Sequence, residues 1–202
     1  SGRWEGMSPS SVFASTANHL AESGWHKGES WGFEVRLPKN FNYADADPTI
    51  VKTLGDWIDC GVVRIDGKPL TQGGMPLSAP AAIFVPAGHT GAAFVLFDNF
   101  RAILKYNNST FYALAIGHLA DRIAGGGPIV KSWPVDAPLL TAEERLELQQ
   151  LLVKLGYDVG DVDGVIGRKS RAALREIQAK YGFVADGYPT KALLIKLRKV
   201  VT

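Results

Sequence analysis

The chain has 202 residues, of which 46% are hydrophobic and 21% charged, with a formal net charge of +2. This small charge and the lack of a long Lys/Arg run argue against a nucleic-acid-binding protein. No apolar run approaches the roughly 18 residues that a membrane span needs, and at about 100 to 200 residues per domain we expect two small domains.

The first 125 residues mix helical and extended patterns. Apolar residues at helical spacing predict helices over 9–23, 48–60 and 111–123. Alternating or short apolar runs predict strands over 31–37, 82–85 and 92–97. Asp47-Pro48 is a favourable start for the second helix, and Asn108 or Ser109 for the third. Short strands among helices indicate an α+β domain with a small β subdomain.

Cysteine and histidine give no sign of a disulfide or a metal centre. Cys60 is the only cysteine, and its place among apolar residues predicts a buried small side chain. The histidines show no metal-ligand spacing, and they are His19, His26, His89 and His118. We therefore expect no metal and no cofactor.

A linker separates this part from the end of the chain. Residues 126–138 contain three prolines and no periodicity, as linkers do. Beyond them, a capping box of Thr141 and Glu144 begins a helix that Gly156 ends, and helices are predicted over 169–181 and 189–200. We place the domains at 1–134 and 139–202. Three short helices bury only a small core, which suits a binding module better than a catalytic one.

A series of short motifs runs through the last segment. They are Leu148-Gln149, Leu155-Gly156-Tyr157, Asp163-Gly164, Gly167, Ser170, Ala173, Ile177-Gln178, Gly182 and Asp186-Gly187. In order and spacing the segment resembles the three-helix modules of the peptidoglycan-binding family, although Ser170 replaces the usual Thr and Ile177 the usual Phe. The resemblance implies a wall-binding module. Its candidate binding residues are Asp163, Gly164, Gly167, Gln178 and Asp186. Alternatively, the glycines among them serve only the turns between helices.

A second set of motifs covers most of residues 8–134. They are Ala14-Ser15-Thr16-Ala17-Asn18-His19-Leu20, Trp31-Gly32-Phe33-Glu34-Val35-Arg36-Leu37-Pro38, Asn99-Phe100 and Lys105-Tyr106-Asn107-Asn108-Ser109. This part resembles the carboxy-terminal half of the catalytic domain of B-type lytic murein transglycosylases, with His19 in place of the usual Tyr. The implied architecture is α+β: a truncated lysozyme-like helical domain with a small β subdomain, followed by the three-helix module.

The resemblance also implies a reaction. These enzymes cleave the MurNAc-GlcNAc bond without water and form a 1,6-anhydro sugar, with one Glu as both acid and base, unlike two-carboxylate glycosidases. In the family that Glu lies on a helix upstream of the motif at 14–20, and this chain begins too late to contain it, so we expect no catalytic residue here. Glu5 could end a calcium loop, but the other ligands of such a loop would be absent.

Tyr106, Asn107 and Asn108 match the Tyr-Asn motif that lines the family's sugar groove. They are therefore candidate substrate-binding residues for peptidoglycan glycan strands, with Tyr106 stacking on a pyranose ring. The alternative for Asn108 is a helix cap. The implied location is the periplasm or cell envelope, and a domain cut through its groove could self-associate. Two other functions stay open: a noncatalytic peptidoglycan-binding or scaffold protein, and a module that binds protein partners.

Overall fold

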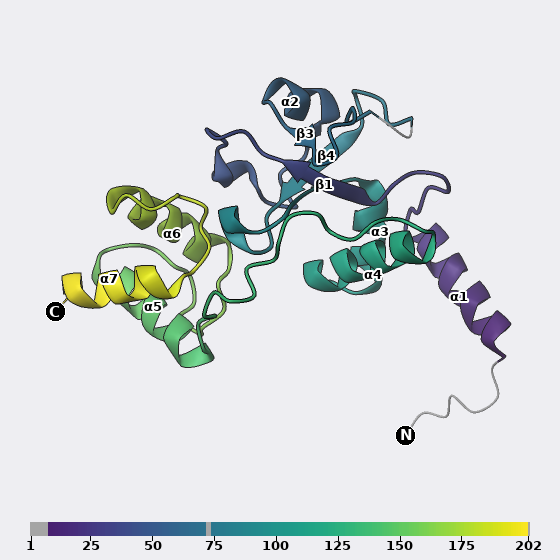
Figure 1. Ribbon diagram of the computed structural model, residues 1–202. Coiled ribbons are helices and arrows are strands. Elements are labelled where there is room, and N and C mark those ends of the chain that lie inside the picture. The colour runs from purple at the N-terminus through teal and green to yellow at the C-terminus, as the bar shows by residue number, and fades with distance from the viewer. Residues whose placement is uncertain (1–7, 72–73, 202) are drawn as a thin grey trace. The chain divides into compact units, whose positions relative to one another are not determined.

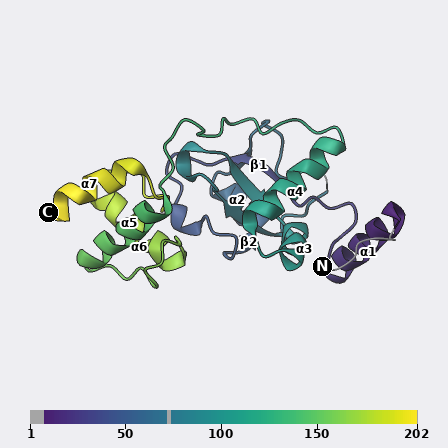
Figure 2. The same cartoon turned by 90° about the horizontal axis from the view of Figure 1, so that it is seen from below.

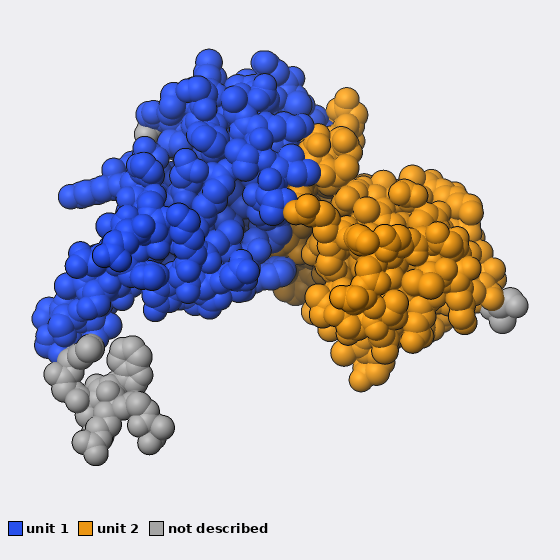
Figure 3. All heavy atoms as spheres, turned by 180° about the vertical axis from the view of Figure 1, so that it is seen from behind, with its two compact units in different colours: residues 1–38, 48–84, 94–130 blue, residues 39–47, 85–93, 131–202 orange. Residues whose placement is uncertain are grey.

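A computed structural model describes residues 8–71 and 74–201. Glu5 lies outside the described residues. The chain forms two compact units (Figure 3). Unit 1 comprises residues 1–38, 48–84 and 94–130, and unit 2 comprises residues 39–47, 85–93 and 131–202. Two short segments of the first half thus belong to unit 2, together with the end of the chain.

A five-stranded sheet forms the centre of unit 1, in the order β2-β4-β5-β1-β3. Its strands are β1 (Gly32–Arg36), β2 (Lys52–Thr53), β3 (Val63–Arg64), β4 (Pro80–Phe84) and β5 (Ala93–Leu96). Antiparallel pairing aligns Ile83 with Val95, and both side chains are buried. The predicted strands at 31–37, 82–85 and 92–97 are therefore confirmed as β1, β4 and β5.

Four helices accompany this sheet (Figure 1). They are α1 (Pro9–Glu22), α2 (Leu54–Asp59), α3 (Asp98–Tyr106) and α4 (Thr110–Ile123). Ser8 caps α1 through its side chain, as the Ser-Pro start signal predicts. The sequence pattern assigns no conformation to the segment that becomes α3. The largest fully buried side chains of this unit are aromatic, and they are Trp57, Phe94, Phe97 and Phe100.

The predicted helix over 48–60 is too long at its start. Residues 52–53 instead pair as β2 with β4, and the helix begins only at Leu54. A capping box holds this start, because the side chain of Thr53 accepts from the N–H of Asp56 while Asp56 accepts from the N–H of Thr53. The prediction of a buried Cys60 is also wrong. Cys60 is the exposed C-cap of α2 and directly follows Asp59, the last residue of the helix, whose buried residues are Leu54 and Trp57.

Three helices pack together in unit 2, and they lie side by side in both ribbon views (Figures 1 and 2). They are α5 (Ala142–Lys154), α6 (Arg168–Lys180) and α7 (Lys191–Val201). The same unit also contains two short 3-10 helices from earlier in the chain, η1 (Tyr43–Asp45) and η2 (Gly88–Thr90). The predicted capping box of Thr141 and Glu144 begins α5. The module core is aliphatic and includes Leu148, Leu152, Leu174, Ile177 and Leu193.

In the described part of the chain, no helix is both long and apolar enough to cross a membrane.

Candidate functional site

Aromatic rings gather where α3 meets α4. Tyr106, the last residue of α3, is 52% exposed although its ring is large and apolar. The ring of Tyr112 stacks beside it, with centroids 6.5 Å apart and an interplanar angle of 14°. The imidazole of His19, from α1, meets the ring of Tyr106 edge-on at 5.4 Å. This arrangement presents a flat ring to solvent and supports it from two sides.

The corner itself is built by caps that leave both asparagines exposed. Asn107 is the C-cap of α3, where its N–H donates to the carbonyl of Ile103 at 3.1 Å. Ser109 is the N-cap of α4, because its Oγ accepts from the N–H of Tyr112 at 3.3 Å. Asn108 lies between the two caps and is not the N-cap, so the helix-cap alternative for it does not hold.

Two polar contacts fix α3 against the segments before the sheet. Asn99 is fully buried, and its amide accepts from the N–H of His26 and donates to the carbonyls of His26 and Glu29. The Nζ of Lys105 donates to the carbonyl of Ser23, the C-cap of α1, at 2.9 Å. Because α1 carries His19 and α3 carries Tyr106, these contacts maintain the ring arrangement of the corner.

In unit 2, the buried amide of Gln149 organises the loop between α5 and α6. Its Oε1 accepts from the backbone N–H groups of Asp163 and Gly164 at 3.1 and 2.7 Å. Its Nε2 lies within 3.1 Å of the carbonyl oxygens of Asp161 and Val165 and of the hydroxyl of Ser170. The fully buried side chain of Gln149 thus provides hydrogen-bond partners for several backbone groups of this loop.

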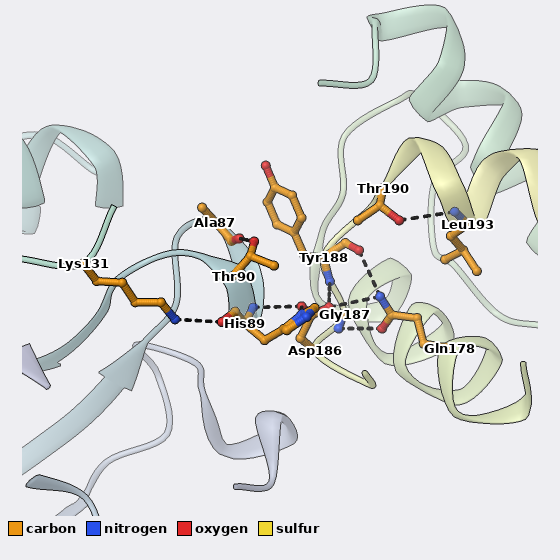
Figure 4. A network of polar contacts seen from close by, with 10 residues as sticks. All are labelled: Ala87, His89, Thr90, Lys131, Gln178, Asp186, Gly187, Tyr188, Thr190 and Leu193. Carbon is orange, nitrogen blue, oxygen red and sulfur yellow. Dashed lines mark hydrogen bonds and ion pairs between the residues drawn. The ribbon is translucent and has the colours of Figure 1, made fainter. Parts of the chain in front are cut away.

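Gln178 repeats this arrangement at the loop between α6 and α7 (Figure 4). Its Oε1 accepts from the N–H of Gly187 at 2.8 Å, and its Nε2 lies 3.0 Å from both the carbonyl of Tyr188 and Oδ1 of Asp186. The same Oδ1 accepts from the N–H of Tyr188, just as Oδ1 of Asp163 accepts from Val165 in the first loop. Each Asp-Gly pair therefore forms a turn that a buried glutamine supports.

The two loops differ at the second carboxylate oxygen. Oδ2 of Asp186 accepts from the backbone N–H of His89 at 2.9 Å and lies 2.6 Å from the imidazole Nδ1 of His89. Lys131 extends this network, because its Nζ donates to the carbonyl of His89 (Figure 4). Asp163, in contrast, is exposed. Asp186 also raises the pKa of Tyr43, although burial of the phenol is the larger cause.

Comparison with known proteins gives the family of each part. Residues 4–121, more than half of the chain, match the transglycosylase SLT domain family. The chain belongs to this family. Residues 141–197 match the peptidoglycan binding domain family. The transglycosylase SLT assignment confirms the resemblance inferred from the motifs of the first part, and the second match confirms the resemblance of the last segment.

Solved structures of SltB3 from Pseudomonas aeruginosa share the fold. In complex with NAG-anhNAM-pentapeptide, SltB3 is 53% identical over 95% of this chain, with a TM-score of 0.88. In complex with NAG-NAM-pentapeptide it is 50% identical over 98% of this chain, with a TM-score of 0.89. The predicted α+β, lysozyme-like fold is thus confirmed. This chain spans 50% and 54% of the length of those two chains.

Another relative matches a shorter stretch of the chain. The spore cortex-lytic enzyme of Bacillus cereus is 40% identical over 62 residues, which cover 29% of this chain and 24% of that protein. This chain thus spans only part of the length of the relatives that it matches.

The predicted wall-binding residues of this transglycosylase SLT chain differ in their exposure to solvent. Gln178 and Asp186 are buried in the network above, and only Asp163 and Gly167 are exposed. Gly164 has φ +81°, and an added Cβ would lie 3.2 Å from the carbonyl oxygen of Ala142, so the turn requires glycine. Gly167 has φ −80° as N-cap of α6, with open space around it. Their contact with a ligand stays a prediction.

Sequence patterns do not reveal two partners in these networks. His89 lies 97 residues before Asp186, and Tyr43 lies even further away, so no spacing rule links them. Gln149, in contrast, stands in the first family motif, and its place on the apolar face of α5 signals a buried amide that needs internal partners. Among the described residues, no group of three or more His, Cys, Asp or Glu side chains could hold a metal ion.

Proposed function

We propose that this chain is the glycan-binding and wall-anchoring part of a lytic transglycosylase that acts on peptidoglycan. Its transglycosylase SLT family and its 53% identity with SltB3, a protein solved with NAG-anhNAM-pentapeptide, carry the proposal. The reaction is non-hydrolytic cleavage of the MurNAc-GlcNAc bond to give 1,6-anhydro-MurNAc. The location that follows from this substrate is the periplasm or cell envelope.

The rings and amides of the α3–α4 corner take the role of substrate binding. Tyr106 offers an exposed ring on which a pyranose can stack, and the ring of Tyr112 and the imidazole of His19 limit its movement. The exposed amides of Asn107 and Asn108 can donate to and accept from sugar hydroxyls and the N-acetyl group. None of these groups is a carboxylic acid, so we assign them binding and orientation rather than proton transfer. We propose that the general acid-base Glu is not among the residues of this chain.

The last segment, with its match to the peptidoglycan binding domain family, serves as the anchor. Since the two buried glutamines use their polar groups inside the fold, we assign wall contact to exposed groups around the first Asp-Gly turn, beginning with Asp163. We accordingly propose a substrate-binding domain at residues 1–134 and a wall-binding domain at residues 139–202.

A pull-down on purified insoluble peptidoglycan tests the two roles. The whole chain is compared with a variant that ends at Pro138. Binding that disappears with the deletion supports the anchor, whereas binding that survives assigns recognition to the α3–α4 corner. If neither protein binds, a module that recognises protein partners becomes the better explanation.

A separate assay tests catalysis. Purified glycan strands are incubated with the chain, and the products are analysed by mass spectrometry for anhydro-muropeptides. We expect none from this chain alone. Their appearance would overturn the proposal that the acid-base group lies elsewhere, and would leave the wall-binding role intact.

A further inference from the structure

A cavity of about 550 Å³ opens in unit 1 at the end of α4 that is distant from Tyr106. Its walls come from β1, from the turn after β3, from the last turns of α4 and from the segment 126–130. This volume is within the range of small-molecule sites, which is roughly 300 to 1,000 Å³. Asp121 lies nine positions after Tyr112, which corresponds to about 13 Å along the helix, so the cavity is distinct from the ring surface at the corner.

Local contacts hold the walls of this cavity in place. Gly117 lets the indole of Trp31 lie directly on α4, since an added Cβ would be 2.6 Å from the ring atom Cδ2. The Nε1 of Trp31 then donates to Oδ2 of Asp121 at 2.8 Å. From β1, Oε2 of Glu34 accepts from the N–H of Val130 at 2.6 Å, which fixes the segment 126–130 against this strand. The protein's own side chains therefore fix the positions of these walls.

The charges of the lining are unequal. Glu34, Asp66 and Asp121 contribute carboxylates, whereas Arg64 is the only guanidinium among the lining residues and His118 the only imidazole. Arg64 already donates two hydrogen bonds to Asp66, at 3.0 and 3.3 Å. Hydrogen bonding from Arg64 is the largest cause that lowers the pKa of Asp66 to about 2. The guanidinium also covers the ring of Phe33, 4.1 Å from its centroid, so this ring face is not open to a sugar.

Among the described residues, Asp121 lacks the charged hydrogen-bond donor that Arg64 gives Asp66. Its one side-chain hydrogen bond within the described chain comes from the neutral indole of Trp31. Partial burial is the largest cause that raises its pKa, while the indole and the nearby His118 act in the opposite direction. A ligand that brings a positive charge to Asp121 would recover part of the hydration that burial removes.

We propose that this cavity binds a side chain that combines an apolar stem with a terminal ammonium, as in a diamino-acid residue of a peptide. The ammonium would lie between Asp121 and Glu34, and the stem would contact Ile129 on the segment 126–130. Resting on the proposed function, the inference assigns this side chain to the peptide stem of the wall. The cavity is then a peptide subsite separate from the glycan surface at Tyr106.

The test uses a probe without sugar, N-acetyl-alanyl-lysine amide, titrated into the ¹⁵N-labelled chain and followed by NMR. The indole N–H of Trp31 is the reporter, because it donates to Asp121. We expect its resonance to shift on titration. We expect Kd to rise at least about tenfold when the probe's Nε is acetylated, and by a similar factor in Asp121→Asn, since a charge-assisted hydrogen bond is lost in each case.

Matched controls complete the design. Asp59→Asn removes an exposed carboxylate of α2 outside the cavity and should leave Kd unchanged. If near-UV circular dichroism shows that Asp121→Asn has lost its fold, Glu34→Gln, a change of the lining carboxylate on β1, decides by the same tenfold criterion. Equal binding of the acetylated probe, or displacement of the probe by N-acetylglucosamine trimer, overturns the inference. Because the probe contains no glycan, a chain that pulls down on wall but ignores the probe contradicts the cavity assignment alone.

Discussion

The imidazole Nδ1 of His89 lies 2.6 Å from Oδ2 of Asp186, and the backbone N–H of His89 donates to the same oxygen at 2.9 Å. Asp186 is almost fully buried, so its carboxylate depends on these donors and on Gln178 and Tyr188 at its other oxygen. One side chain thus joins η2 to the loop before α7 within unit 2.

We expect His89→Ala and Asp186→Asn each to lower the unfolding free energy of unit 2, with a coupling energy of about 1.5 to 3 kcal/mol in a double-mutant cycle. The physical reason is that either change removes a charge-assisted hydrogen bond from a buried group. Urea unfolding of the two single variants and the double variant gives this value. Additive single effects would show that the side-chain contact contributes nothing beyond the backbone donor.

Gln149→Ala should unfold the three-helix module, or destabilise it by at least about 3 kcal/mol, because several backbone groups of the loop lose a buried hydrogen-bond partner. Far-ultraviolet circular dichroism during thermal unfolding measures the change. Gln150→Ala is the matched control, since its neighbouring side chain is exposed on the same helix. Equal stability of the two variants would contradict the role assigned to the buried amide.

Tyr106→Ala should weaken binding of a soluble N-acetylglucosamine oligomer by roughly five- to tenfold, as expected for the loss of one stacked ring. Tyr106→Phe retains the ring and should bind nearly as well. Isothermal titration calorimetry compares them with Phe111→Ala, which removes another exposed ring of α4. Because Tyr106 is half exposed, the melting temperature should change little.

The stability of unit 1 should depend on pH through Asp121. Burial raises its pKa above the ordinary 3.8, so the folded chain keeps this proton at pH values where the unfolded chain has lost it. The difference in unfolding free energy between the native chain and Asp121→Asn should therefore fall as the pH rises above about 4, then become constant above the folded pKa. Urea titrations from about pH 3 to about pH 7 measure it, and a rising difference would contradict the sign.

Apolar side chains of α1 and α4 should drive self-association at high concentration. Phe13 is 73% exposed and Ile123 is 80% exposed, with Leu119 one turn before it on the same face of α4. Sedimentation velocity should detect dimers or larger species that Leu119→Glu together with Ile123→Glu reduces. A strictly monomeric chain that unfolds cooperatively at a high midpoint would contradict this expectation.

Periodicity predicts the long elements of this protein well, because α1, β1 and α4 each carry their own apolar pattern. Periodicity fails where pairing with a distant strand determines the conformation of a segment. Residues 48–53 have helical spacing, yet Lys52 and Thr53 pair with β4, and the start of α2 depends on the local capping box. The two-residue strand β3 is too short to leave any pattern.

The candidate sites show the same limit. The motif around Tyr106 is visible in the sequence, and the corner indeed exposes its ring. The contact between Trp31 and Asp121 spans 90 residues, and that between His89 and Asp186 spans 97. Sequence patterns describe neighbours only a few residues apart, so neither contact could be predicted without the three-dimensional fold.

The buried glutamines have a consequence for how relatives of the module are read. Several residues of its motif, including Gln149, Gln178 and Asp186, use their polar atoms in hydrogen bonds within unit 2. Two proteins can therefore share these buried motif residues and still bind different ligands, because these residues stabilise the fold. Ligand preference should vary with solvent-facing positions that no motif includes, such as Val162 and Val165 beside the first turn.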